Sequence, residues 1–316
     1  MLLKFVKIFS HLYVSVKNIN HMYKLILFFV FCILYKLCKS SLHKKNNLSI
    51  AVCISGCIRS FPRASYREGL KRLLTAFPKA HFFLVLKRND VSYTKHQPLF
   101  LSKAGVDGFM KTMDIIRHNT KNIIIFDKFE NKKIDKSIFA SQIRMIDMCL
   151  NTAAKYYNYD FYVRYRPDFV LIDTLLPKDL YSIDENTIYT ARKFDAIGND
   201  QVFMFSKKLK KEWWDKYVMP TTQKMLSSNE KTSPEYFIFD KKSGTHTVKN
   251  GPFFYGGLLR TNENHIVTWD EKLCTEHTII DDWKQMTLNI KPYNKDQLLL
   301  NVLIEQRYPV QYQNIL

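Results

Sequence analysis

Along residues 48–171, short apolar runs alternate with apolar residues at helical spacing. The runs have the length of buried strands, and the spaced residues form one face of each intervening helix. The predicted strands are 48–54, 82–86, 123–126 and 160–171, and the predicted helices are 66–77, 102–117 and 139–157. Strands that alternate with helices predict an α/β fold with a mostly parallel sheet and helices on both faces.

The second half of the chain has a less regular pattern. Residues 187–190 and 201–206 have the composition of strands, and 209–225 and 296–306 that of helices. With no internal repeat and no long linker, a single α/β domain over residues 48–316 is the simplest organisation.

An uninterrupted apolar run at 25–35 lies between Lys24 and Lys36. Extended to 23–38, it is shorter than the roughly 20 residues of most spanning helices, although the flanking lysines can snorkel to the headgroups. We expect a signal-anchor helix at 23–38, after a basic segment at 1–22 and before a basic stem at 39–47. A cleaved signal peptide and a buried core helix are the alternatives.

The net charge of +19 favours anionic partners such as headgroups, phosphorylated substrates or nucleic acid. The lysines are spread along the chain, and neither zinc-finger spacing nor an RNA-binding signature is present, so nucleic acid is not the expected partner. Phosphate-loop, dinucleotide-binding and nucleophile-elbow motifs are also missing, which leaves kinase, dehydrogenase and hydrolase functions unsupported.

The segment 160–171 carries the strongest chemical signal. Arg164, Arg166 and Asp168 are two residues apart, so in a strand they project to one face. Pro167 cannot donate a ladder hydrogen bond, which predicts that the ladder stops there or that the strand lies at an edge. Arginine forks match phosphate oxygens and a carboxylate can hold a divalent metal, so the set is suited to a sugar-nucleotide diphosphate. The alternative is a surface ion-pair ladder, in which these side chains pair with one another and contribute little to stability.

Three further groups of residues are candidates for the same site. Ser55, Gly56 and Arg59 follow the first strand, where ligands bind in open α/β sheets, although an ordinary strand-to-helix turn has the same composition. Asp200 and Gln201 precede an apolar strand, and Asp200 is a candidate metal ligand, general base or turn cap. Glu235 follows Ser233 and Pro234, a pattern that is also typical of a helix start.

Four motifs in this order resemble a family of glycosyltransferase-like proteins of large DNA viruses, algae and bacteria, related to WavE-type lipopolysaccharide-synthesis enzymes. They are SG-x-x-R (Ser55, Gly56, Arg59), R-x-RPD (Arg164, Arg166, Pro167, Asp168), a DQ turn (Asp200, Gln201) and a PE pair (Pro234, Glu235). The resemblance spans roughly residues 48–240.

The resemblance implies a GT-A-like fold and a nucleotide-sugar donor, with a glycan or glycoconjugate acceptor. Ser55, Gly56, Arg59, Arg164, Arg166 and Gln201 would bind the donor, and Asp168 would hold Mn²⁺ or Mg²⁺. Asp200 or Glu235 would act as the base in an inverting reaction. The expected location is a single-pass membrane protein with a lumenal domain of the Golgi or endoplasmic reticulum type, or a virus-encoded equivalent.

The chain departs from the family pattern at the start of its second strand, where relatives carry an acidic residue and this chain has His81. The Asp-x-Asp motif is absent too. These departures keep a second function open, a non-catalytic membrane-tethered protein that binds anionic glycans or lipid headgroups. A third possible function is that of a sulfo- or phosphotransferase.

Overall fold

The computed structural model describes residues 29–30, 48–58, 61–87, 103–173, 183–191, 200–228, 238–239, 246–250, 254–259, 266–267, 303 and 305–312. The chain divides into two compact units, Met1–Leu48 and Ser49–Leu316. Of the predicted anchor, only Phe29 and Val30 are described, both helical and exposed, and the predicted stem lies outside the described residues. Within the described part, no helix has the length and apolar character required to cross a bilayer. The predicted anchor therefore gains no support from the structure.

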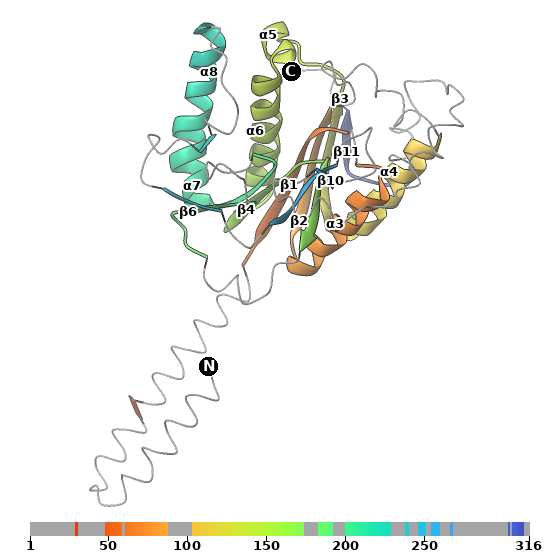
Figure 1. The fold of residues 1–316 in the computed structure, drawn as a ribbon, viewed down its shortest axis with the longest axis horizontal. Helices are drawn as coiled ribbons and strands as arrows, with labels where there is room; N and C mark the ends of the chain where they lie inside the picture. The colour runs from red at the N-terminus through yellow and green to blue at the C-terminus, as the bar shows by residue number, and fades with distance from the viewer. Residues whose placement is uncertain are drawn as a thin grey trace, which may run out of the picture. The chain divides into compact units, whose positions relative to one another are not determined.

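The second unit is built on a mixed sheet of eight strands in the order β11-β3-β2-β1-β4-β7-β6-β8 (Figure 1). The first five are parallel, β7 is antiparallel to β4 and β6, and β8 is parallel to β6. The mostly parallel sheet predicted from the sequence is confirmed. The strands are β1 (Ile50–Cys57), β2 (His81–Lys87), β3 (Thr120–Phe126), β4 (Phe161–Tyr165), β6 (Thr187–Thr190), β7 (Val202–Ser206), β8 (Thr247–Asn250) and β11 (Val310–Tyr312).

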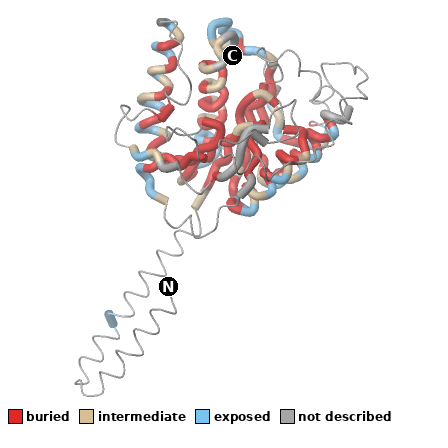
Figure 2. The backbone as a smooth tube through the Cα atoms, in the orientation of Figure 1, coloured by how far each residue is buried: buried red, intermediate tan, exposed pale blue. Residues whose placement is uncertain are grey.

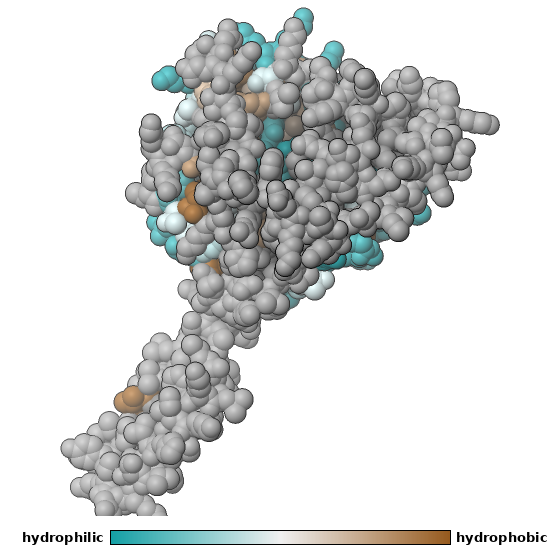
Figure 3. All heavy atoms as spheres, viewed as in Figure 1, coloured by the Kyte–Doolittle hydropathy of each residue, from teal (hydrophilic) through white to brown (hydrophobic). Residues whose placement is uncertain are grey.

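Helices cover both faces of this sheet, as the alternating pattern predicts (Figure 1). On one side lie α3 (Ala64–Ala76) and α4 (Lys103–Ile116), whose outer side carries hydrophilic side chains (Figure 3). On the other lie α6 (Ile138–Tyr156) and a continuous helical stretch of α7 (Lys207–Leu209), the π-helical η4 (Lys210–Val218) and α8 (Met219–Ser228). Two further short helical elements are η2 (Arg117–Asn119) and α5 (Lys132–Lys136).

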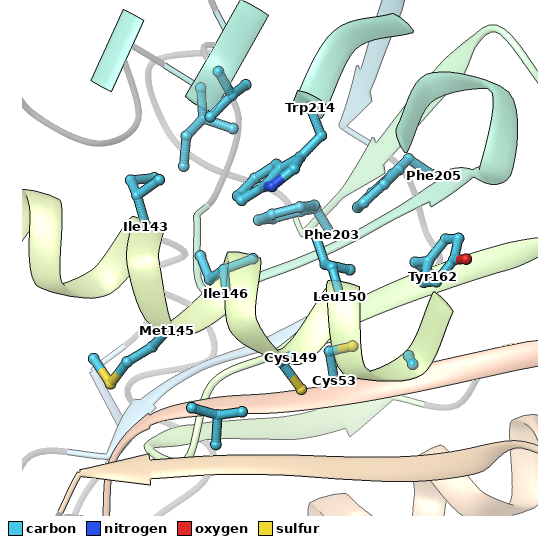
Figure 4. Close-up of a cluster of buried hydrophobic side chains, with 14 of the residues drawn as sticks. Cys53, Ile143, Met145, Ile146, Cys149, Leu150, Tyr162, Phe203, Phe205 and Trp214 are labelled. Carbon is cyan, nitrogen blue, oxygen red and sulfur yellow. The ribbon is translucent and has the colours of Figure 1, made fainter. Parts of the chain in front are cut away.

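The strands are almost entirely buried, and the core between them and α6 is rich in aromatic rings (Figures 2 and 4). Phe205 of β7 stacks on Trp214 with the ring planes 11° apart, and Phe203 also stacks on Trp214. Ile146 and Cys149 of α6 belong to the same cluster. This packing fixes α6 over the sheet and so determines which of its side chains reach the strand ends.

The segment 160–171 forms two strands in two different sheets. The ladder of β4 stops at Tyr165, two residues before Pro167, and the Phe169 amide donates to the Arg166 carbonyl at 3.1 Å to close a turn. The chain then enters β5 (Phe169–Asp173), which belongs to a second sheet in the order β10-β9-β5. Its other strands are β9 (Tyr255–Leu259) and β10 (Ile266–Val267). The predicted end of the ladder is confirmed, and the sheet switch is the new finding.

Helix α3 packs directly against the backbone of β5. A Cβ atom at Gly69 would lie 2.7 Å from the Leu171 nitrogen and 3.0 Å from the Tyr165 hydroxyl. Arg72 Nη1 donates to the Leu171 carbonyl at 3.2 Å. The close approach of helix and strand therefore depends on glycine at position 69.

We expect Gly69→Ala to lower the free energy of unfolding by about 1–3 kcal/mol, because overpacking a close contact forces the backbone apart. Urea unfolding followed by tryptophan fluorescence measures the change. The matched control is Glu68→Ala on the exposed side of the same helix, which should change stability by less than about 0.5 kcal/mol. Equal effects of the two substitutions would contradict the close packing.

Candidate active site

The candidate residues of the second half meet at the carboxyl end of β4. Because β7 runs antiparallel to β4, its first residue Val202 pairs with Tyr165, the last residue of β4. The Arg166 amide then donates to the Gln201 carbonyl at 2.9 Å. The topology therefore brings Asp200 and Gln201 beside the Arg166–Asp168 turn, which sequence spacing alone does not show.

The Arg166 guanidinium lies between two buried carboxylates. Its Nη2 donates to Asp168 Oδ2 at 3.1 Å, and its Nε lies 2.7 Å from Asp168 Oδ1 in an ion pair. Its Nη1 is 3.9 Å from Asp200 Oδ2. The side chains of Asp168 and Asp200 are only 6% and 3% exposed, so this is not the surface ladder that spacing also allowed.

Helix α6 supplies a residue that the sequence analysis did not identify. Gln142 donates from Nε2 to Asp200 Oδ2. The helix connects β3 to the parallel strand β4, so it runs against them and its start, capped by Ser137, lies at their carboxyl ends. A signal was available, because Gln142 occupies the i+3 position of an apolar face that begins at Phe139 and continues at Ile143.

Arg164 is fully buried on the α6 side of the sheet. Its Nη1 donates to the Tyr165 carbonyl at 2.8 Å, and its Nε has no hydrogen-bond partner among the residues described. Burial, and next the nearby Arg166, lower the pKa of Arg164 to about 10, whereas Asp200 and Asp168 oppose the shift. The side chain therefore stays cationic at neutral pH and retains a donor that can bind an anion.

The end of β1 contacts this cluster, and Ser55 and Gly56, which the sequence placed in a turn after the first strand, lie within the strand. Gly56 has φ +143°, a backbone conformation that favours glycine, and a Cβ there would lie 3.1 Å from Pro167 Cδ and 3.9 Å from Arg164 Nη2. The neighbouring Ser55 is fully buried, and its hydroxyl has no hydrogen-bond partner within the described ranges. Buried polar atoms are nearly always paired, so Ser55 Oγ and Arg164 Nε mark a place suited to a polar ligand.

The structure thus places seven of the predicted site residues at one edge of the sheet: Ser55, Gly56, Arg164, Arg166, Asp168, Asp200 and Gln201. Arg59 and Glu235 lie outside the described residues. His81, the departure from the family pattern, opens β2 at the opposite edge, where its Nδ1 is 2.6 Å from the Tyr159 hydroxyl. His81 therefore lies at the amino end of β2, whereas the cluster lies at the carboxyl ends of the strands.

A lysine at the end of β2 adds a positive charge at the same edge. Lys87 is opposite Cys57 in the β1–β2 register and is 3% exposed. Its Nζ lies 5.6 Å from the centre of the Phe129 ring. The sequence analysis missed it, although a lysine that ends an apolar strand is the available signal.

The described residues do not fit the divalent metal expected at Asp168. Both Asp168 oxygens face the fork of Arg166, whereas Mn²⁺ and Mg²⁺ need direct contact with several oxygens. Among the residues described, no three acidic, histidine or cysteine side chains come close enough together to hold a metal ion. The guanidinium nitrogens of Arg164 and Arg166 lie at this edge, and they suit the oxygens of an anion.

Comparison with known proteins found no matching family model and no matching curated protein. Among solved structures, the apo form of the glycosyltransferase GlyE from Streptococcus pneumoniae TIGR4 has 12% identity and a TM-score of 0.40, over 84% of this chain and 74% of that one. The galactosyltransferase LgtC with donor and acceptor sugar analogues has 14% identity and a TM-score of 0.34, over 78% and 84%.

A mannosyltransferase from Pyrobaculum calidifontis, in complex with GDP-Man and Mn²⁺, has 9% identity and a TM-score of 0.36, over 66% of this chain and 55% of that one. These structures are all glycosyltransferases. At TM-scores of 0.40 and below, we draw neither the fold nor the activity of this chain from them. The WavE-type family stays a prediction from the motifs.

The ion pair itself is open to a stability test. Arg166→Met leaves the Asp168 carboxylate buried without its cation, and loss of one partner of a buried pair costs about 3–5 kcal/mol. We expect the free energy of unfolding at pH 7 to fall by about 3 kcal/mol, measured by urea unfolding. The double variant Arg166→Met with Asp168→Asn should recover part of that loss.

The control is Lys71→Met, which breaks the Lys71–Glu68 pair on α3, where both side chains are more than half exposed. Exposed pairs contribute about 0–1 kcal/mol, so this variant should unfold almost as the parent does. If Arg166→Met lowered the free energy of unfolding no more than the control does, the Arg166–Asp168 pair would be solvated rather than buried.

Proposed function

We propose that this chain is a membrane-anchored glycosyltransferase that transfers a sugar from a nucleotide-sugar donor to a glycan or glycoconjugate acceptor. One observation carries the proposal: near the carboxyl ends of the neighbouring strands β1 and β4, the buried donors Ser55 Oγ and Arg164 Nε have no hydrogen-bond partner among the described residues. From β1 the chain proceeds outward through β2 and β3, then returns to β4 on the other side of β1. Open α/β sheets bind their ligands at such a switch point.

The chemistry of this edge suits a diphosphate. Gly56 leaves room for the Pro167 ring beside the end of β1, and two guanidiniums and a lysine supply cationic donors. In glycosyl transfer, negative charge develops on the diphosphate as it leaves, and donors that are already oriented stabilise it without reorganisation. Arg164 and Arg166 would fill this role.

The acceptor side of the reaction is less constrained. Asp200 accepts a hydrogen bond from Gln142 and faces Arg166, contacts that orient the carboxylate. We assign to Asp200 the positioning of Arg166 or the activation of the acceptor hydroxyl, and to Glu235 the base in an inverting reaction. Anchoring through residues 23–38, with the domain of residues 48–316 in a lumenal compartment of the Golgi or endoplasmic reticulum type, completes the proposal.

Nucleotide binding to the full chain in detergent tests the proposal. A thermal-shift titration with UDP, GDP and CMP should show stabilisation by one of them, by about 2.7 kcal/mol at a hundredfold excess over Kd. Arg164→Met should weaken that nucleotide at least about tenfold, because hydrogen bonds to charged groups contribute about 1.5–3 kcal/mol.

Arg117→Met is the matched control, because Arg117 is exposed and directly precedes β3 at the opposite edge of the sheet. It should leave nucleotide affinity unchanged. Lack of stabilisation by all three nucleotides would refute the proposal. Binding of anionic glycans, with an affinity that decreases smoothly as the salt concentration rises, would then support the non-catalytic binding function.

A further inference from the structure

We infer that this site grips the donor diphosphate with guanidinium groups and binds it without a divalent cation, and that Asp168 is a positioning residue for Arg166. The inference rests on the proposed function and goes beyond it, because it replaces the metal ion expected at Asp168 with a side chain of the protein.

The first support is the occupation of Asp168. Its two oxygens are engaged by two different nitrogens of one guanidinium, at 2.7 Å and 3.1 Å. A cation at the 2.0–2.1 Å or so that Mg²⁺ requires from either oxygen would be repelled by Arg166 unless that guanidinium moved away. The displaced guanidinium would then lie in a largely buried place without its carboxylate, which is unfavourable.

The second support is the state of Asp200, the other carboxylate of the cluster. Its Oδ2 accepts a hydrogen bond from Gln142 and faces Arg166 Nη1. Arg166 is thus held from two sides by acidic groups, and its position is determined before any ligand arrives. A preorganised cation of this kind stabilises the negative charge of a diphosphate, as a bound metal ion does.

The third support is the set of donors that remain. The Nη1 of Arg166 is 3.9 Å from Asp200, beyond hydrogen-bond length, and the Nε of Arg164 has no partner within the described part of the chain. Each arginine therefore uses some nitrogens to fix its own position and keeps another for a ligand. The Ser55 hydroxyl adds a neutral donor from the adjacent strand.

The test is a calorimetric titration of the full chain in detergent with UDP, GDP and CMP, in EDTA and then in Mn²⁺ or Mg²⁺. We expect the Kd of the preferred nucleotide to agree within about twofold between the two conditions. Binding only in the presence of metal would overturn the inference and leave the proposed function standing. If none of the three nucleotides bound in either condition, both the proposed function and the inference would be rejected.

Two variants test the role of Asp168. Arg166→Lys keeps the charge but not the bidentate fork, so we expect nucleotide binding at least about tenfold weaker, with no rescue by Mn²⁺. Asp168→Asn should also weaken binding, whereas Asp168→Glu, which retains a carboxylate for Arg166, should restore part of it. Both Asp168 variants should be as insensitive to EDTA as the parent.

The pattern expected of a metal ligand is different. Mn²⁺ would strengthen nucleotide binding by the parent, and Asp168→Asn would abolish that gain while Arg166→Lys would retain it. This result would overturn the inference even if the variants had similar affinities in EDTA. Thermal unfolding of each variant, measured without nucleotide, separates loss of binding from loss of the fold.

Discussion

Pro167 ends the hydrogen-bond ladder of β4, and the architecture of the site depends on that interruption. A residue with an amide hydrogen at this position could extend the strand, whereas proline lets the chain turn at Arg166–Asp168 and enter a second sheet. The turn places Asp168 back against Arg166. It also brings the proline ring against the end of β1, where only a residue without a Cβ fits comfortably, so Gly56 and Pro167 form one contact.

The charged residues at this edge are held in place by one another and by the core beneath them. Arg166 is fixed between Asp168 and Asp200, and Asp200 is fixed by Gln142. The aromatic packing of Phe203, Phe205 and Trp214 keeps α6 at the distance from which Gln142 reaches the cluster. A hydrophobic layer thus supports a polar layer whose charged side chains are linked by hydrogen bonds and ion pairs.

The remaining unsatisfied atoms give this arrangement its functional meaning. A cluster that served stability alone would gain from pairing every buried donor, since each unpaired group has a desolvation cost. Here Arg164 Nε and Ser55 Oγ are left without hydrogen bonds among the described residues, on neighbouring strands at the switch point of the sheet. That cost is consistent with a site whose binding energy is completed by an anionic ligand.

The sequence by itself determined the order and type of most elements, because the strands are apolar enough and the helices periodic enough for local patterns to be decisive. The positions of β1, α3, β2, α4, β3, α6, β6 and β7 follow from those patterns to within a few residues. Strand geometry predicts the face of β4 on which Arg164 lies and Pro167 marks the end of the ladder, whereas Arg166 and Asp168, predicted to share that strand face, lie in the turn that follows.

Only the tertiary structure decided which of these residues meet. The antiparallel direction of β7 brings Asp200 to Arg166, and the packing of α6 brings Gln142 to Asp200; neither is encoded in local spacing. Spacing placed Asp168 beside two arginines but left open whether it would bind a metal or a guanidinium. The turn at Pro167 directs the Asp168 carboxylate to Arg166, because that reversal of the chain sets the distance between the side chains of Arg166 and Asp168.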